Sequence, residues 1–127
     1  RVGPFGITSI RGLVRHEGDD MFVAVYKHRR HHKDGTSEHG IYYSTSKNMI
    51  NWSAPKLLVS ADLQPDAGPG DPFVSYPSII DDNSPDRLFG TIDNEASLLF
   101  VRLIPVRHNG KWMMTRRLVR QPIHIER

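Results

Sequence analysis

The chain has 127 residues, with 17 Lys and Arg against 14 Asp and Glu, a formal net charge of +3 and no cysteine. This length favours a single β domain over residues 1 to 127, which would bury roughly two thirds of the surface that its unfolded chain exposes. The basic residues gather at residues 28 to 33 and 115 to 120 without forming a dense stripe, so a nucleic acid is not expected as a partner.

The lack of cysteine excludes disulfides and thiolate metal or redox sites, and it leaves the cellular compartment open. No window reaches the ~18 apolar residues of a membrane-spanning helix, so we expect no membrane partner. The chain begins at Arg1 rather than at methionine. We therefore expect a mature fragment or a piece of a longer chain.

The first half of the chain predicts an antiparallel meander over residues 8 to 59. Four short β-prone runs are separated by turn signals, at residues 9 to 16, 21 to 28, 40 to 46 and 52 to 59. The run MFVAVYKH, residues 21 to 28, is apolar on both faces and predicts a central strand. Asp34 and Gly35 favour a hairpin loop. Pro55 indicates that the fourth strand lies at an edge.

The second half repeats this order. Residues 60 to 75 contain three prolines and two glycines and predict a crossing loop. A second four-stranded meander is then expected over residues 76 to 120, with strands at residues 76 to 82, 87 to 93, 97 to 106 and 111 to 120. Asn109 and Gly110 strongly favour a hairpin between the last two strands. Residues 121 to 127 remain as a C-terminal segment.

Each expected meander has a tryptophan at the start of its fourth strand, Trp52 and Trp112. A repeated four-stranded meander is typical of propeller blades, which bury both faces against their neighbours. The alternative is a β-sandwich, in which two meanders stack without any true repeat. Two blades do not close a ring, because propellers typically need at least four. The propeller interpretation therefore requires further blades, either in a longer chain or in a homo-oligomer.

The stretch SKNMINW, Ser46 to Trp52, resembles the Ser-x-Asp-Leu-x-x-Trp turn of the five-bladed propeller glycoside hydrolases, the arabinanase, xylosidase and invertase-like superfamily. Asn48 replaces the aspartate of that motif and keeps its turn chemistry. The sialidase Asp-box is more distant, since Ile50 occupies its glycine position and the tryptophan comes one residue early. The run YPSIID, residues 76 to 81, is similar to the inner-strand openings of such propellers.

The resemblance implies a carbohydrate partner, no cofactor, and a protein that hydrolyses or recognises a glycan. Propeller glycosidases use acidic side chains on either side of the scissile bond, contributed by several blades. Two blades would hold only part of such a set. The alternative from a different class is a non-catalytic module that binds a glycan or an anion, or that has a structural role.

Three carboxylates are the catalytic candidates of the chain: Asp71, Asp81 and Glu95. Asp71 precedes a proline in the expected crossing loop, where an inner-rim carboxylate or an Asx turn is possible. Asp81, with Asp82, ends an expected strand and is also explained by a turn. Glu95 follows Asp93 between two expected strands, where hairpin chemistry accounts for both. None of these positions matches a catalytic motif of the family.

The substrate-binding candidates are Tyr42, Tyr76, Arg102 and Arg117. Tyr42 stands beside the basic run of residues 28 to 33, which could bind an acidic sugar or phosphate through charge-assisted hydrogen bonds. Tyr76 opens the run that resembles an inner strand. Arg102 or Arg117 could hold a substrate carboxylate. The alternative for the basic residues is a solvent-exposed face that protects an edge strand.

The histidines of the basic run do not predict a metal site. His28, His31 and His32 lie within five residues, and neutral imidazole is a good metal ligand. Arginine and lysine side chains interrupt this cluster, however, and their charge opposes a bound cation. We therefore expect no metal.

Overall fold

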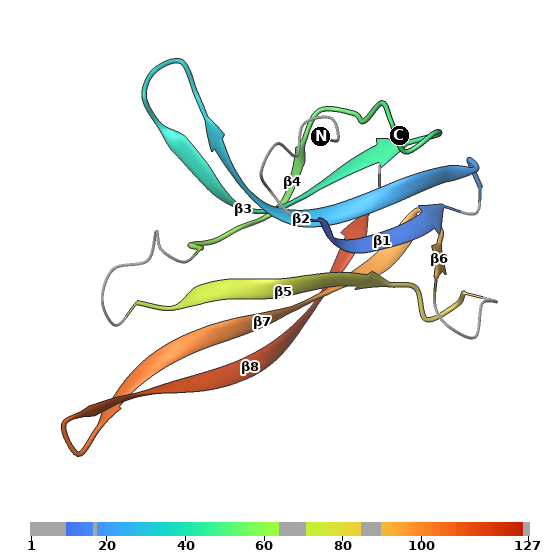
Figure 1. Ribbon diagram of the computed structural model, residues 1–127. Helices are drawn as coiled ribbons and strands as arrows, with labels where there is room; N and C mark the ends of the chain where they lie inside the picture. Colours follow the sequence, from blue (N-terminus) through green and yellow to red (C-terminus); the bar gives the residue numbers. More distant parts are fainter. Residues whose placement is uncertain (1–9, 17, 64–70, 85–89, 126–127) are drawn as a thin grey trace.

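The computed structural model describes residues 10–16, 18–63, 71–84 and 90–125 (Figure 1). All regular secondary structure in these ranges is β-strand, which confirms the prediction of an all-β chain. The strands form a curled five-stranded mixed sheet of order β4-β3-β2-β1-β6 and a three-stranded antiparallel sheet of order β5-β7-β8. The described residues contain no helix that could cross a membrane.

The first four strands form the expected antiparallel meander. They are β1 (Ile10–His16), β2 (Met21–His31), β3 (Ser37–Ser46) and β4 (Lys56–Ser60). The prediction of a central strand at residues 21 to 28 is confirmed, because β2 lies between β1 and β3. The fourth strand lies at an edge, as Pro55 indicated, but its expected start at residue 52 is wrong, because β4 begins at Lys56 and both Trp52 and Pro55 precede it.

The described part of the second half of the chain does not form the expected four-stranded meander. Its sheet contains only β5 (Phe73–Ile80), β7 (Glu95–His108) and β8 (Lys111–His124). Of the strand expected at residues 87 to 93, the described part is β6 (Thr91–Ile92), which pairs in parallel with β1 of the other sheet. The reason is burial, because this pairing places the side chain of Ile92 in the core between the two sheets. No propeller blade is shown by the described residues.

Several expected boundaries also differ from the structure, since β2, β3 and β7 are each longer than the runs expected at residues 21 to 28, 40 to 46 and 97 to 106. The crossing loop was expected to continue to residue 75, whereas β5 begins at Phe73, and residues 64–70 lie outside the described part. The expected end of the last strand at residue 120 is wrong, because β8 continues through Pro122 to His124. Ile123 and Ile125 are buried, so the end of the chain contributes to the core.

The two sheets form two layers (Figure 1), and one cluster of buried apolar side chains includes residues of both. The first sheet contributes Val14, Met21, Val23, Val25, Ile41, Tyr43 and Ile92, and the second contributes Val74, Ile79, Leu98, Phe100 and Ile123. Fully burying a side chain of this size contributes about 1.5–3 kcal/mol. This single shared core follows the sandwich alternative more closely than it follows two independent blades.

The motif turn between β3 and β4 has the hydrogen bonds that its sequence predicts. The hydroxyl oxygen of Ser46 accepts the Met49 amide at 2.9 Å, and Oδ1 of Asn48 accepts the amides of Ile50 and Asn51, each at 2.9 Å. The indole N–H of Trp52 donates to the Met49 carbonyl at 3.3 Å. Asn48 therefore closes the turn in the way that an aspartate would.

The two tryptophans do not occupy equivalent places, contrary to the expected repeat. Trp52 is half-buried against Ala24, Tyr26 and Tyr42, on the face of the first sheet that points away from the common core. Trp112 lies within β8 and is 58% exposed, with the Arg107 guanidinium over its ring.

The hairpin predicted at Asn109 and Gly110 is confirmed. His108 and Lys111 pair on either side of a two-residue turn, and both turn residues have positive φ, 49° and 76°. This is the type I′ geometry that fits the twist of the flanking strands.

Replacing Gly40 with alanine should destabilise the fold strongly. A Cβ at this position would collide with the backbone carbonyl of Val59, where β3 and β4 pair. We expect a loss of about 3 kcal/mol in the free energy of unfolding, measured with urea. Gly35→Ala is the matched control, because its Cβ meets no atom within 4 Å and only its φ of 88° opposes alanine. The control should lose about 1 kcal/mol, and equal losses would contradict the packing argument.

Candidate functional site: a cleft between the sheets

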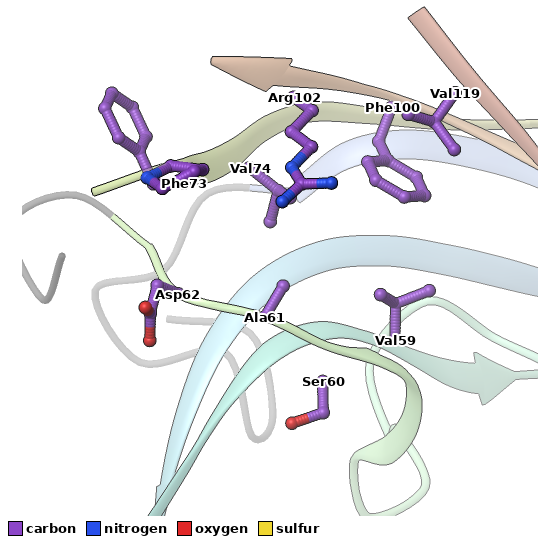
Figure 2. A pocket seen from close by; sticks show the side chains of 10 residues that line it. Val59, Ser60, Ala61, Asp62, Phe73, Val74, Phe100, Arg102 and Val119 are labelled. Atoms are coloured by element: carbon purple, nitrogen blue, oxygen red, sulfur yellow. The ribbon is translucent and has the colours of Figure 1, made fainter. Parts of the chain in front are cut away.

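A cleft of about 440 Å³ opens between the two sheets (Figure 2). The end of β4 and the residues after it form one wall, and β5, β7 and β8 form the other. The apolar part of the lining includes Val59, Phe73, Val74, Phe100 and Val119. An apolar wall with a few polar groups is the usual composition of a small-molecule site.

Arg102 supplies the positive charge among the described residues that line the cleft. Figure 2 shows its guanidinium pointing into the space between Val74 and Phe100. Arg102 lies two residues after Phe100 on β7, so both side chains project from the same face of the strand. Asp62 lies across the cleft, and its backbone carbonyl accepts the Val74 amide at 2.9 Å.

Arg117 is the direct cross-strand partner of Arg102 on β8. Paired residues on neighbouring antiparallel strands project to the same face of the sheet. The two arginines therefore stand side by side on the inner face of the second sheet, beyond the buried core. Within the described residues, no carboxylate forms an ion pair with either of them.

This pair of guanidinium groups can bind an anion. A guanidinium presents a planar fork of N–H donors that matches a carboxylate or a phosphate. Both arginines are exposed to solvent, so an anion would reach their guanidinium groups directly. The arrangement thus combines two cations with aromatic and aliphatic surfaces.

Two other candidates, Asp71 and Tyr76, lie apart from this pair of arginines. Asp71 is exposed and immediately precedes Pro72, which lines the cleft. Tyr76 does not line the cleft; it is 60% exposed and sits at a bulge of β5 with a φ of 55°. Such a conformation is uncommon for a residue with a large side chain. The structure gives no contact that assigns a role to either side chain.

Tyr42 is fully buried, so its ring offers no surface to a ligand in this structure. Its hydroxyl donates to the Glu38 carbonyl at 2.9 Å, and the His28 ring packs edge-on at 5.1 Å. Burial, together with the neighbouring Glu38 carboxylate, raises the pKa of Tyr42 to about 12. Burial also lowers the pKa of His28, and the nearby His31 and Arg30 add to this effect.

The structure brings two of the catalytic candidates together in a second pocket. Asp81 and Glu95 line a pocket of about 310 Å³ with Asp93, Asn83 and Asn94. No local pattern in the sequence indicated that Asp81 and Glu95 would line the same pocket.

The carboxylate of Asp81 is used by the backbone. One oxygen accepts the Asn83 amide at 2.9 Å and the other accepts the Asp93 amide at 3.0 Å. Asp81 is 6% exposed and joins the end of β5 to the turn before β7. Asp81 therefore stabilises the turn at the end of β5, as its position after an expected strand predicted.

Glu95 and Asp93 are open to solvent, with 79% and 64% of their side chains exposed. Glu95 contacts Nδ1 of His124 at 2.6 Å. Beneath them lies His16, which is 1% exposed. Its Nε2 contacts Oδ1 of Asn94 at 2.7 Å, and its Nδ1 accepts the Asp19 amide at 3.3 Å. Sequence reasoning missed this histidine, since its main partner is 78 positions away.

Among the residues that the structure describes, no group of three or more His, Asp or Glu side chains is arranged to hold a metal ion. The histidines of the basic run lie on the β2–β3 hairpin, where His31 pairs with Ser37. Comparison of the chain with protein-family models, with curated proteins and with solved structures finds no match.

The raised pKa of Tyr42 predicts a loss of stability at alkaline pH. The ordinary pKa of tyrosine is 10.0, so an unfolded chain releases this proton near pH 10, whereas the folded chain holds it until about pH 12. The contribution to stability is thus fully present below pH 10 and is lost as the pH rises through 12. Urea unfolding across this window should show a falling free energy of unfolding.

Tyr42→Phe is the test of that assignment, because it removes the titrating hydroxyl and keeps the ring. The variant should show a smaller fall over the same window, with Tyr26, whose pKa burial also raises, providing the rest. An identical fall in the variant and the parent protein would exclude Tyr42 as a cause.

Proposed function

We propose that the protein recognises a glycan that carries a carboxylate, and that the cleft between the sheets is the binding site. The observation that carries this proposal is the Arg102 guanidinium, which points into an apolar cleft with Arg117 beside it and no carboxylate of the described residues paired to either. A sugar carboxylate would accept the paired N–H donors, while the half-buried Val59 and Val119 would contact the apolar face of the ring.

Hydrolysis is the second candidate, and the pocket with Asp81, Asp93 and Glu95 is the observation that favours it. A glycosidase needs one carboxyl group kept protonated, usually by burial, and a second carboxylate at a defined separation. In this pocket the buried member, Asp81, is bonded to two backbone amides, and the other two are exposed. The geometry therefore supports recognition better than catalysis.

A propeller of the glycoside hydrolase type remains a proposal for the complete assembly. The antiparallel order of β1 to β4 and the hydrogen-bonded turn from Ser46 to Trp52 support it. Such an assembly would need further blades, from a longer chain or from other copies. Light scattering after size exclusion measures the solution mass and so tests whether other copies supply the blades. A strictly monomeric chain would exclude a homo-oligomeric ring.

Replacing Arg102 with glutamine should weaken binding of an acidic sugar. The probe is trigalacturonic acid, with maltotriose as the uncharged comparison, and the measurement is isothermal titration calorimetry. We expect a loss of about tenfold or more, because a hydrogen bond to a charged group contributes about 1.5–3 kcal/mol. Arg107→Gln is the matched control, since it removes the same charge from the same strand outside the cleft lining. Equal binding by both variants, or binding of neither sugar, would contradict the proposal.

The same mixtures report on hydrolysis through the release of new reducing ends. If the protein recognises the sugar without cleaving it, no new reducing ends should appear. Release that is lost in Glu95→Gln and kept in Arg102→Gln would instead favour a glycosidase at the second pocket.

A further inference from the structure

The hairpin of β7 and β8 extends far beyond the rest of the second sheet. The pairing of β5 with β7 begins at Phe73 opposite Leu103, so the hairpin from Ile104 to Thr115 has only two strands. Figure 1 shows it as an arm that projects away from both sheets. β8 has 14 residues and lies at the edge of its sheet. One side of this long strand is thus without a neighbouring strand in the described part of the chain.

The hairpin turn determines which amides of β8 face that free side. In a two-residue turn, the residue after the turn donates its N–H to the residue before it, so the Lys111 amide points at β7. The ladder alternates along an antiparallel pair. The amides at even-numbered positions from Trp112 to Arg120 therefore point outward. Pro122, which has no N–H, also stands at an even position, as expected for a proline in an edge strand.

The side chains along this edge are apolar and basic. Leu118 is 71% exposed, and Trp112, Met113 and Met114 are also exposed on the arm. β8 contains four Lys and Arg residues and no Asp or Glu. Natural proteins usually shorten, twist or cover an edge strand, because it presents unpaired donors and acceptors to other chains. A long edge with exposed large apolar side chains is open to pairing.

The charges select the occupant. An antiparallel pair of two β8 strands would bring the basic residues of one copy opposite or next to those of the other, and like charges across a pair are destabilising. An acidic strand would instead place carboxylates opposite these basic residues, and opposite charges across a pair are stabilising. Arg116 and Arg117 project to opposite faces of the sheet, so carboxylates on either face of an incoming strand would find a guanidinium. Leu118 projects to the same face as Arg116 and would contact an apolar residue of the incoming strand.

We propose that β8 is a docking edge, at which an extended acidic segment of another polypeptide adds as a fourth strand to the sheet β5-β7-β8. The outward amides from Trp112 to Arg120 provide the main-chain hydrogen bonds, and Arg116 and Arg117 select carboxylates on the incoming segment, whereas Arg120 already pairs with Asp82. This inference rests on the edge of β8 and not on the cleft lining, although Arg117 also stands beside Arg102 in the site proposed for the glycan.

The test uses a blocked octapeptide of alternating glutamate and valine, with the lysine and valine peptide as the charge-reversed comparison. Fluorescence anisotropy should show binding of the acidic peptide, weakened by added salt, and no binding of the basic peptide. Leu118→Pro removes one outward amide without removing an internal hydrogen bond, and it should weaken binding at least tenfold. Leu118→Ala keeps the amide and is the control, with a smaller loss expected.

Amide hydrogen exchange on the parent protein gives a second test that needs no variant. In the free protein, the even-numbered amides from Trp112 to Leu118 should exchange rapidly, while Met113, Thr115 and Arg117 are protected by β7. Adding the acidic peptide should slow the even-numbered set. Equal binding of both peptides, no effect of Leu118→Pro, or no new protection would overturn the proposal. A dimer that is lost in Leu118→Pro would also overturn it, because the occupant would then be a second copy.

Discussion

The apolar cluster in which Val23 and Val25 of β2 pack with Leu98 and Phe100 of β7 joins the two sheets into one structure. β7 is long enough to leave this cluster and to continue beyond it. Its inner face carries Phe100 in the core and, two residues later, Arg102 at the point where the second sheet separates from the first. The cleft therefore opens where β7 extends beyond the apolar core. The projecting arm is the continuation of the same strand.

The acidic pocket has a different origin, because it lies where the chain passes from one sheet to the other. β6 belongs to the first sheet and β7 to the second, and Asp93 and Asn94 form the step between them. Asp81 and the buried His16 fix that step through hydrogen bonds to these two residues. Asp81 and Asn94 are thus engaged in joining the layers, whereas the carboxylates of Asp93 and Glu95 are open to solvent. This is the physical reason to place ligand recognition at the arginine pair rather than here.

Local signals in the sequence predicted what depends on neighbouring residues. The doubly apolar run at residues 21 to 28 became the central strand, Asn109-Gly110 became the hairpin turn, and Ser46 and Asn48 closed their turn. The predictions that failed concern contacts between residues far apart in the sequence. The parallel pairing of Thr91 and Ile92 with β1 is favoured by burial in a core that no local pattern reveals. Likewise, Arg102 and Arg117 were each candidates, but only the register of β7 and β8 shows them as a pair.

The central claim is that both sheets share one core, which holds the cleft and its arginines in place. Native-state hydrogen exchange tests it most directly, because amides protected only by global unfolding report a common free energy of opening. A shared core predicts the same free energy of opening for the centre of β2, around Val25, and for the base of β7, around Phe100. Two clearly different values, one for each sheet, would show that the sheets open as separate units like independent blades. That result would contradict the single core and remove the basis for a fixed cleft.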